Sequence, residues 1–261
     1  MSLEKIPSTG GASIAIERTG QGKPLLVIHG TASTRQRWFL TAAALGQGRE
    51  LILMDRRGRG DSTDAKSYSI EHEFDDVTAV VSHIGKPLDI LAHSYGAMIT
   101  LGAALRLRHV DNIVLYEPPL DPLPPDSDLP DRIEACVERG DLEGGLRLFL
   151  THVGVSEADL AKLRELPSWP QRLTIVPTIP REMREARSLA FSSAHLQKIS
   201  TRILLQLGSD SPPRFGQAID VLAKSLPSAS VEMLPGQKHQ AMDTAPALFV
   251  TSVRTFFGDA G

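Results

Sequence analysis

The chain has 261 residues, of which 41% are hydrophobic and 23% charged, and its formal net charge is −3. This composition is ordinary for a globular protein with one large domain, or with a core domain that carries an insertion. It excludes the basic charge pattern that binding to nucleic acid or to a membrane surface requires.

One cysteine, Cys136, leaves no internal disulfide and no metal site made of several thiolates. The eight histidines follow no metal-ligand spacing. The N-terminus lacks the apolar core of a signal peptide, and no run of about 18 apolar residues follows. We therefore expect a cytoplasmic protein with a small-molecule substrate and no metal or other cofactor. The oligomeric state is left open.

Short apolar runs alternate with helical patterns through most of the chain. The alternating stretch 12–20 predicts a hairpin or edge strand, and the run 23–30 a buried strand. Further strands are expected at the start of 50–62 and over 87–94, 111–119, 201–209 and 230–237, and helices over 35–45, 69–85, 95–108, 214–226 and 245–257. This order predicts an α/β fold with a mostly parallel, twisted sheet and helices on both faces.

The alternation stops between residues 120 and 200. A segment rich in proline and aspartate, "LDPLPPDSDLP", is followed by helical patterns with no good strand candidate. We expect an all-helical lid over 120–200, inserted into an α/β core made of 1–119 and 201–261.

The stretch "LAHSYGA" places Ser94 between a predicted buried strand and a predicted helix. Ala92 and Gly96, the residues two positions away on either side, are both small. This is the pattern of a nucleophile elbow, in which a sharp turn exposes the serine hydroxyl and small neighbours let the helix pass close by. Ser94 is therefore the candidate nucleophile.

A serine hydroxyl needs an adjacent base to attack at neutral pH. His239 lies in "LPGQKHQAMD", after the last predicted strand and before the last predicted helix. His93 is adjacent to the serine on a strand and is expected to point to the opposite side. The position of His239 favours it as the base.

Negative charge that develops on a substrate oxygen needs backbone N–H donors. The segment "VIHGTAST" follows an early strand, and the amides of Thr31 and Tyr95 are expected to converge above Ser94. His29 is expected to hold this loop by hydrogen bonding.

Four motifs together resemble the α/β-hydrolase superfamily, in its lid-bearing group of serine esterases, cofactor-free haloperoxidase-like enzymes and C–C hydrolases. They are "HG" at 29–30, "DRRGRGDS" at 55–62, "AHSYGA" at 92–97 and "PGQKH" at 235–239. The resemblance implies a catalytic triad in the order serine, acid, histidine. It also implies that Asp55 and Arg57 brace the region behind the site.

Two residues are candidates for the acid. The family usually places it after the strand that follows the lid, three residues beyond a glycine, but that spacing in "LQLGSDSPP" reaches Ser211 and Asp210 is one residue short. Some relatives carry the acid after the strand that precedes the lid, where this chain has Glu117. We favour Asp210 and keep Glu117 as the alternative.

A serine nucleophile forms acyl-enzymes, so carboxylic esters, thioesters, lactones and amides are the expected substrates. Trp38 and Met242 are expected to contact the acyl group. A lyase, an acyltransferase or a perhydrolase on the same fold, or a receptor that binds a ligand without turnover, remain alternatives.

Overall fold

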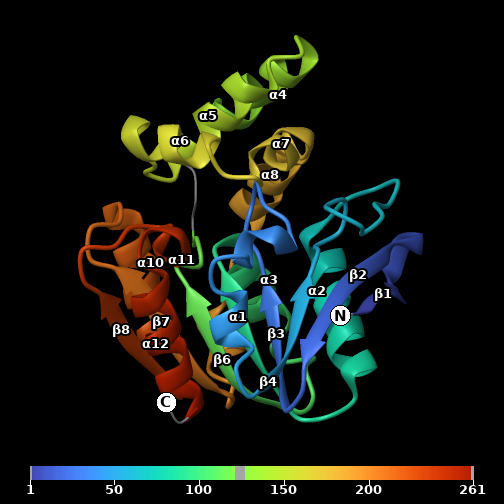
Figure 1. Ribbon diagram of the computed structural model, residues 1–261, viewed down its shortest axis with the longest axis vertical. Coiled ribbons are helices and arrows are strands. Elements are labelled where there is room, and N and C mark those ends of the chain that lie inside the picture. Colours follow the sequence, from blue (N-terminus) through green and yellow to red (C-terminus); the bar gives the residue numbers. More distant parts are fainter. Residues whose placement is uncertain (1, 121–126, 260–261) are drawn as a thin grey trace.

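The computed structural model describes residues 2–120 and 127–259. Its centre is an eight-stranded sheet in the order β1-β2-β4-β3-β5-β6-β7-β8 (Figure 1). The strands are β1 (Ser2–Pro7), β2 (Ser13–Gly20), β3 (Lys23–Ile28), β4 (Arg49–Met54), β5 (Leu88–His93), β6 (Val110–Tyr116), β7 (Arg202–Gly208) and β8 (Ala229–Leu234). β2 runs antiparallel to β1 and to β4, and the other neighbours pair in parallel. The expected α/β class is confirmed.

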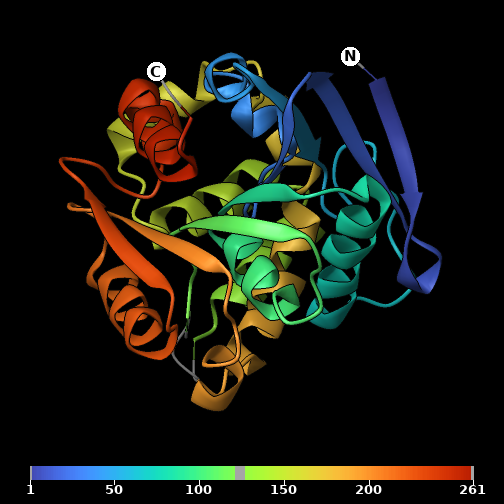
Figure 2. The same cartoon turned by 90° about the horizontal axis from the view of Figure 1, so that it is seen from below.

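Helices cover both faces of the sheet (Figure 2). α2 (Ile70–Ile84), α3 (Tyr95–Ala103) and α10 (Pro213–Ser225) pack on one face, and α1 (Ala42–Leu45) and α12 (Pro246–Phe257) on the other. Successive strand residues point to opposite faces. Leu26 and Ile28 therefore join the first core, and Leu25 and Val27 join the second.

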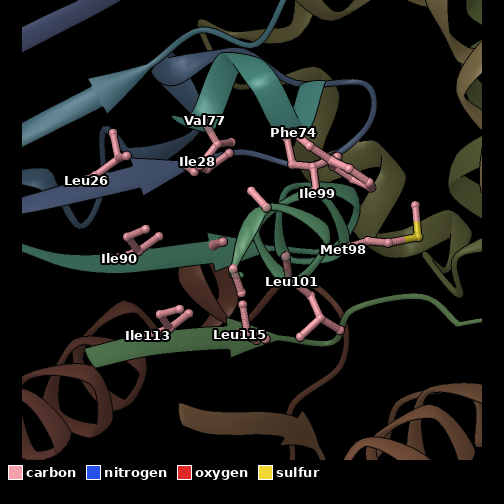
Figure 3. Packing of buried hydrophobic residues seen from close by; sticks show 14 of the residues in the cluster. Leu26, Ile28, Phe74, Val77, Ile90, Met98, Ile99, Leu101, Ile113 and Leu115 are labelled. Carbon is pink, nitrogen blue, oxygen red and sulfur yellow. The ribbon is translucent and has the colours of Figure 1, made fainter. Parts of the chain in front are cut away.

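Close packing of α2 against α3 sets the position of the helix that begins after Ser94. Phe74 of α2 lies next to Ile99 of α3, in the same hydrophobic cluster as the strand residues Ile90 and Ile113 (Figure 3). A Cβ at Gly102 would lie 2.2 Å from the Phe74 ring, so the glycine lets the ring reach the α3 backbone. Burial of each such aliphatic side chain contributes about 1.5–3 kcal/mol.

The segment between β6 and β7 contains helices joined by short loops and no strand in its described residues, 117–120 and 127–201. It contains α4 (Leu129–Glu138), α5 (Leu142–His152), α6 (Glu157–Arg164), α7 (Trp169–Thr174), the short 3₁₀ turn η3 (Val176–Thr178), α8 (Ile179–Ser188) and α9 (Ser193–Leu196). α4 to α8 gather above the carboxyl ends of the parallel strands (Figure 1). They enclose a hydrophobic cluster that includes Ile133, Leu146 and Ile179, and Ala32 of the core joins it. Most of the proline-rich start of this segment, residues 121–126, lies outside the described residues.

Two expected elements differ in detail, and one strand is additional. The helix expected over 35–45 is a 3₁₀ turn, η2 (Arg35–Trp38), followed by the single turn α1, because the backbone N–H of Arg35 donates to Asp55 and the Arg35 guanidinium pairs with the same carboxylate. α3 ends at Ala103 instead of 108. β1 was not expected and pairs with β2 over its whole length.

Among the described residues, no helix combines the length and the apolar character that crossing a membrane would need.

Candidate active site

Ser94 stands on a strained turn between β5 and α3. Its φ of 55° and ψ of −123° lie in a region that residues with a side chain rarely adopt. A Cβ at Gly96 would lie 2.5 Å from the carbonyl oxygen of His29, so the turn requires glycine there. A Cβ at Gly30 would lie 2.9 Å from the Ser94 Cβ. Two glycines thus bring the loop after β3 against the serine.

His239 lies on the loop after β8 and faces Ser94 directly. The Ser94 hydroxyl donates to Nε2 of His239 at 2.9 Å, and both side chains are buried. The Phe215 ring stacks on the imidazole with centroids 4.4 Å apart. This stacking holds the ring plane toward the serine.

Glu117 completes a line of three side chains. Nδ1–H of His239 donates to Oε2 of Glu117 at 2.6 Å, which leaves Nε2 free to accept from Ser94. The other carboxylate oxygen, Oε1, accepts from the Gly208 amide at 2.8 Å and from the Ser211 hydroxyl at 2.5 Å. Glu117 is fully buried and has a φ of 47°, a second strained position at the end of a strand.

Asp210, the acid that the sequence favoured, lies elsewhere. Its side chain is exposed and accepts from the Ser209 hydroxyl at 2.8 Å, and its backbone N–H donates to the Gln237 carbonyl. The loop after β7 therefore approaches the His239 loop through its backbone. Ser211, which occupies the usual family position of the acid, donates to Glu117 instead.

Thr31 and Tyr95 lie beside Ser94, as expected, and line a hollow with it. Tyr95 is the first residue of α3, so its amide has no acceptor four residues earlier within the helix. A helix N-terminus also favours negative charge.

His93 makes a contact that the sequence did not suggest. Its Nε2–H donates to the backbone carbonyl of His239 at 2.9 Å, and the two rings lie 4.6 Å apart. The side chain therefore lies beneath the His239 loop and does not point to the other side of the sheet. Burial, reinforced by the positive charge of nearby groups, holds the pKa of His93 well below its ordinary value. His93 supports the loop in its neutral form.

The loop over 55–62 braces the core behind the site. Asp55 is buried and accepts from the amides of Arg35 and Asp61, and Arg57 forms a two-pronged ion pair with Asp76. His29 accepts from the Arg56 amide at 3.1 Å and contacts the Gly30 carbonyl through Nδ1, so it joins the loop after β3 to the 55–62 loop.

Trp38 and Met242, expected to contact substrate, lie in the core instead. Their exposed fractions are 0% and 1%, and neither lines any of the cavities described below. Trp38 stacks on Phe249, and Met242 Sδ accepts from an Arg37 N–H at 3.0 Å. Both side chains pack in the hydrophobic cluster that contains α12 and do not face a substrate.

Two small hollows meet at Ser94. The first measures about 10 Å³, and we call it the polar hollow because its lining includes Ser33, Arg37, His93, Arg172 and Gln240 beside the serine; the apolar Phe149, Leu150 and Val153 also line it. The second, the apolar hollow, measures about 40 Å³. Its lining includes Tyr95, Pro119, Phe149, Met183, Ala186 and Phe215. A larger cavity of about 510 Å³ opens on the outer side of the 236–240 loop and is not lined by Ser94.

The sequence did not single out Arg37, Arg172 or Phe215. Phe215 follows "SDSPPR". Its position just after the β7 loop is the only sequence signal that could have identified it as a residue near the site. No group of three or more histidine, cysteine, aspartate or glutamate side chains in the described ranges is placed to hold a metal ion.

Comparison with known proteins identifies the family and the fold. The family model described as "Alpha/beta hydrolase family" matches residues 25–251. The crystal structure of an alpha/beta hydrolase from Sphaerobacter thermophilus is 29% identical, with a TM-score of 0.84 over 97% of this chain and 100% of that one.

Curated relatives match over shorter stretches. A probable oxidoreductase, EphD, of Mycobacterium tuberculosis is 28% identical over 100 residues, 36% of this chain. A cis-3-alkyl-4-alkyloxetan-2-one decarboxylase of Shewanella oneidensis is 26% identical over 188 residues, 64% of this chain. The matches span 17% and 58% of the lengths of those two proteins.

Proposed function

The chain belongs to the alpha/beta hydrolase family, and from this premise we propose that it is a serine hydrolase that cleaves small or medium-sized carboxylic esters through an acyl-enzyme on Ser94. The observation that carries the proposal is the unbroken line of hydrogen bonds from Ser94 through His239 to Glu117. A strained serine, an imidazole in the correct tautomer and a buried carboxylate are the parts that acyl transfer requires.

The reaction follows from the order of these contacts. His239 Nε2 takes the hydroxyl proton as Ser94 Oγ attacks the ester carbonyl, and the same proton then goes to the departing alkoxide. Water, deprotonated by His239, attacks the acyl-enzyme and releases the acid. Glu117 holds the ring orientation and stabilises the imidazolium that forms at each step.

The amides of Thr31 and Tyr95 serve as donors to the oxyanion in this proposal. Two preorganised N–H groups at the start of α3 and in the loop after β3 stabilise charge where it develops. The helices between β6 and β7 act as a lid, because Phe149 of α5 and Met183 of α8 close the apolar hollow over the serine.

The test is hydrolysis of p-nitrophenyl acetate and butyrate, with one acid and one alcohol released per ester. Ser94→Ala is expected to lower kcat by at least about 10³-fold, since the residual rate then comes from binding and the oxyanion donors alone. Ser192→Ala, which removes an exposed hydroxyl at the start of α9, serves as the matched control and is expected to keep full activity. Equal rates in the two variants would refute the proposal.

A further inference from the structure

Arg172 of α7 carries a buried charge that no residue in the described part of the chain pairs with directly. Its exposed fraction is 5%, and no hydrogen bond or ion pair among the described residues includes its guanidinium. Burial, together with the nearby charge of Arg37, lowers the pKa of Arg172 to about 9. The group therefore stays charged at neutral pH, and a buried charge without a partner costs stability.

Arg37, in the same hollow, has direct partners for both terminal nitrogens of its guanidinium, although its Nε has none. It forms an ion pair with Asp243 at 2.8 Å and donates to Gln240 and to Met242. Asp243 contacts Arg37 directly and attracts Arg172 only from a distance. The two arginines thus share one nearby carboxylate, and Arg172 is the one without a direct partner.

Arg172 lies next to the candidate nucleophile. Arg172 lines the polar hollow together with Ser94, Thr31 and His239, and it also lines the small adjoining hollow that Ser33 and Arg37 share. An anion in the polar hollow would therefore contact Arg172 while the rest of the same molecule lies at the nucleophile.

Three other arginines on or near the lid have hydrogen-bond or ion-pair partners within the protein. On α8, Arg181 pairs with Asp64 and Arg184 with Asp131 and Glu134. Arg214 lines the apolar hollow and donates to the His152 carbonyl.

We propose that Arg172 binds a carboxylate carried by the substrate, so that the preferred substrates are esters or amides bearing a free carboxylate, such as half-esters of dicarboxylic acids. This inference rests on the proposed function and names its substrate class. The carboxylate lies in the polar hollow, the scissile carbonyl at Ser94, and the uncharged group in the apolar hollow. Because the polar hollow now has room for about one water molecule, the carboxylate enters with a displacement of α7 from the core.

The first experiment compares monoethyl and diethyl esters of succinic, glutaric and adipic acids, which differ only in the free carboxylate. We expect the half-ester to be favoured in kcat/KM, and the ratio to fall by about 10- to 100-fold in Arg172→Met, as loss of a charge-assisted hydrogen bond requires. Arg172→Lys should recover part of the ratio. Arg132→Met, on the exposed face of α4, is the matched control and should leave the ratio as in the unmodified protein.

The second experiment measures binding without turnover. Titration of the Ser94→Ala protein with succinate, glutarate and adipate by calorimetry should give a dissociation constant that rises by about 10- to 100-fold when Arg172→Met is added. Thermal unfolding accompanies both experiments. Removing an unpaired buried charge should leave Tm unchanged or raise it.

The outcomes separate the two proposals. Diacid binding that depends on Arg172, in a protein that cleaves no ester, would support the anion site and refute the proposed function. Ester cleavage with a ratio and a dissociation constant indifferent to Arg172 would overturn the inference and leave the proposed function intact. A large fall in Tm for Arg172→Met would also overturn it, because the arginine would then serve the fold.

Discussion

Two buried histidines, His29 and His93, support the loops around Ser94, His239 and Glu117. His29 donates from Nδ1 to the Gly30 carbonyl and accepts at Nε2 from the Arg56 amide, a pattern that requires the neutral ring. Burial is the main cause that holds the pKa of both histidines well below 6.5, and Arg56 beside His29 and His239 beside His93 add to it. Uptake of a proton by either ring therefore lowers the stability of the fold.

The free energy of unfolding should therefore depend on pH. A histidine whose pKa is lowered in the folded state contributes stability that is fully present above its unfolded pKa of about 6.5 and is lost as the pH falls below it. For two such groups the loss between pH 7.5 and 5.5 is about 2–3 kcal/mol. Urea unfolding at a series of pH values measures it.

The slope of that curve identifies the residues. His29→Gln should remove about half of the pH dependence, whatever it does to stability at pH 7.5. His83→Gln, which changes an exposed ring paired with Glu4, should leave the slope as it was. A free energy that stays constant from pH 7.5 to 5.5 would contradict the neutral assignment of both rings.

At the scale of elements, the unit made by β5, the turn at Ser94 and α3 determines the site. The turn brings the start of α3 so close to the loop after β3 that a Cβ at Gly96 would lie 2.5 Å from the His29 carbonyl oxygen and 2.8 Å from that of Ile28. Both contacts are with backbone, which cannot turn aside as a flexible side chain can. The helix itself would have to move, and Ser94 would move with it.

Gly96→Ala is accordingly expected to lower the free energy of unfolding by about 1–3 kcal/mol, the usual cost of overpacking, and to lower the proposed esterase activity. Gly216→Ala is the matched control, because it makes the same change within α10, where the new methyl meets only Leu207 at 3.8 Å. It should be neutral or stabilising by about 0.4–1 kcal/mol. Equal effects of the two substitutions on urea unfolding would show that the close approach at Gly96 does not constrain the turn.

At the scale of the whole molecule, the parallel sheet brings the site residues together at the carboxyl ends of its strands. Ser94 follows β5, Glu117 follows β6 and His239 follows β8, so residues far apart in the chain meet where the strands end. The helical segment is tied to this edge by charge. Glu182 of α8 accepts from Arg56 and from Arg59, and all three are buried.

The sequence was enough to predict the α/β class, the helical segment after β6, and the facing pair of Ser94 and His239. Alternating apolar runs and the small residues around Ser94 are local patterns, and local patterns can be recognised in a single sequence. The partner of His239 is not local. Glu117 and Asp210 follow neighbouring strands, and only the turn at Glu117, with its φ of 47°, aims one carboxylate at the ring.

Burial is the other quantity that the sequence does not contain. Trp38 and Met242 are large apolar residues close to the site in the chain, and such residues fill a core as readily as they line a pocket. Arg172 shows the reverse case. In the sequence Arg172 resembles any arginine on a helix. Its burial and its lack of a direct partner among the described residues are visible only in the structure.

The central claim is that Ser94, His239 and Glu117 act as one unit, and the most direct measurement compares the two carboxylates. Glu117→Gln and Asp210→Asn each remove one negative charge with little change of shape. The rate of p-nitrophenyl acetate hydrolysis should fall by about 10²–10⁴-fold in Glu117→Gln, because an amide beside Nδ1 no longer fixes the tautomer, and should stay near that of the unmodified protein in Asp210→Asn. A large loss in Asp210→Asn with full activity in Glu117→Gln would contradict the account.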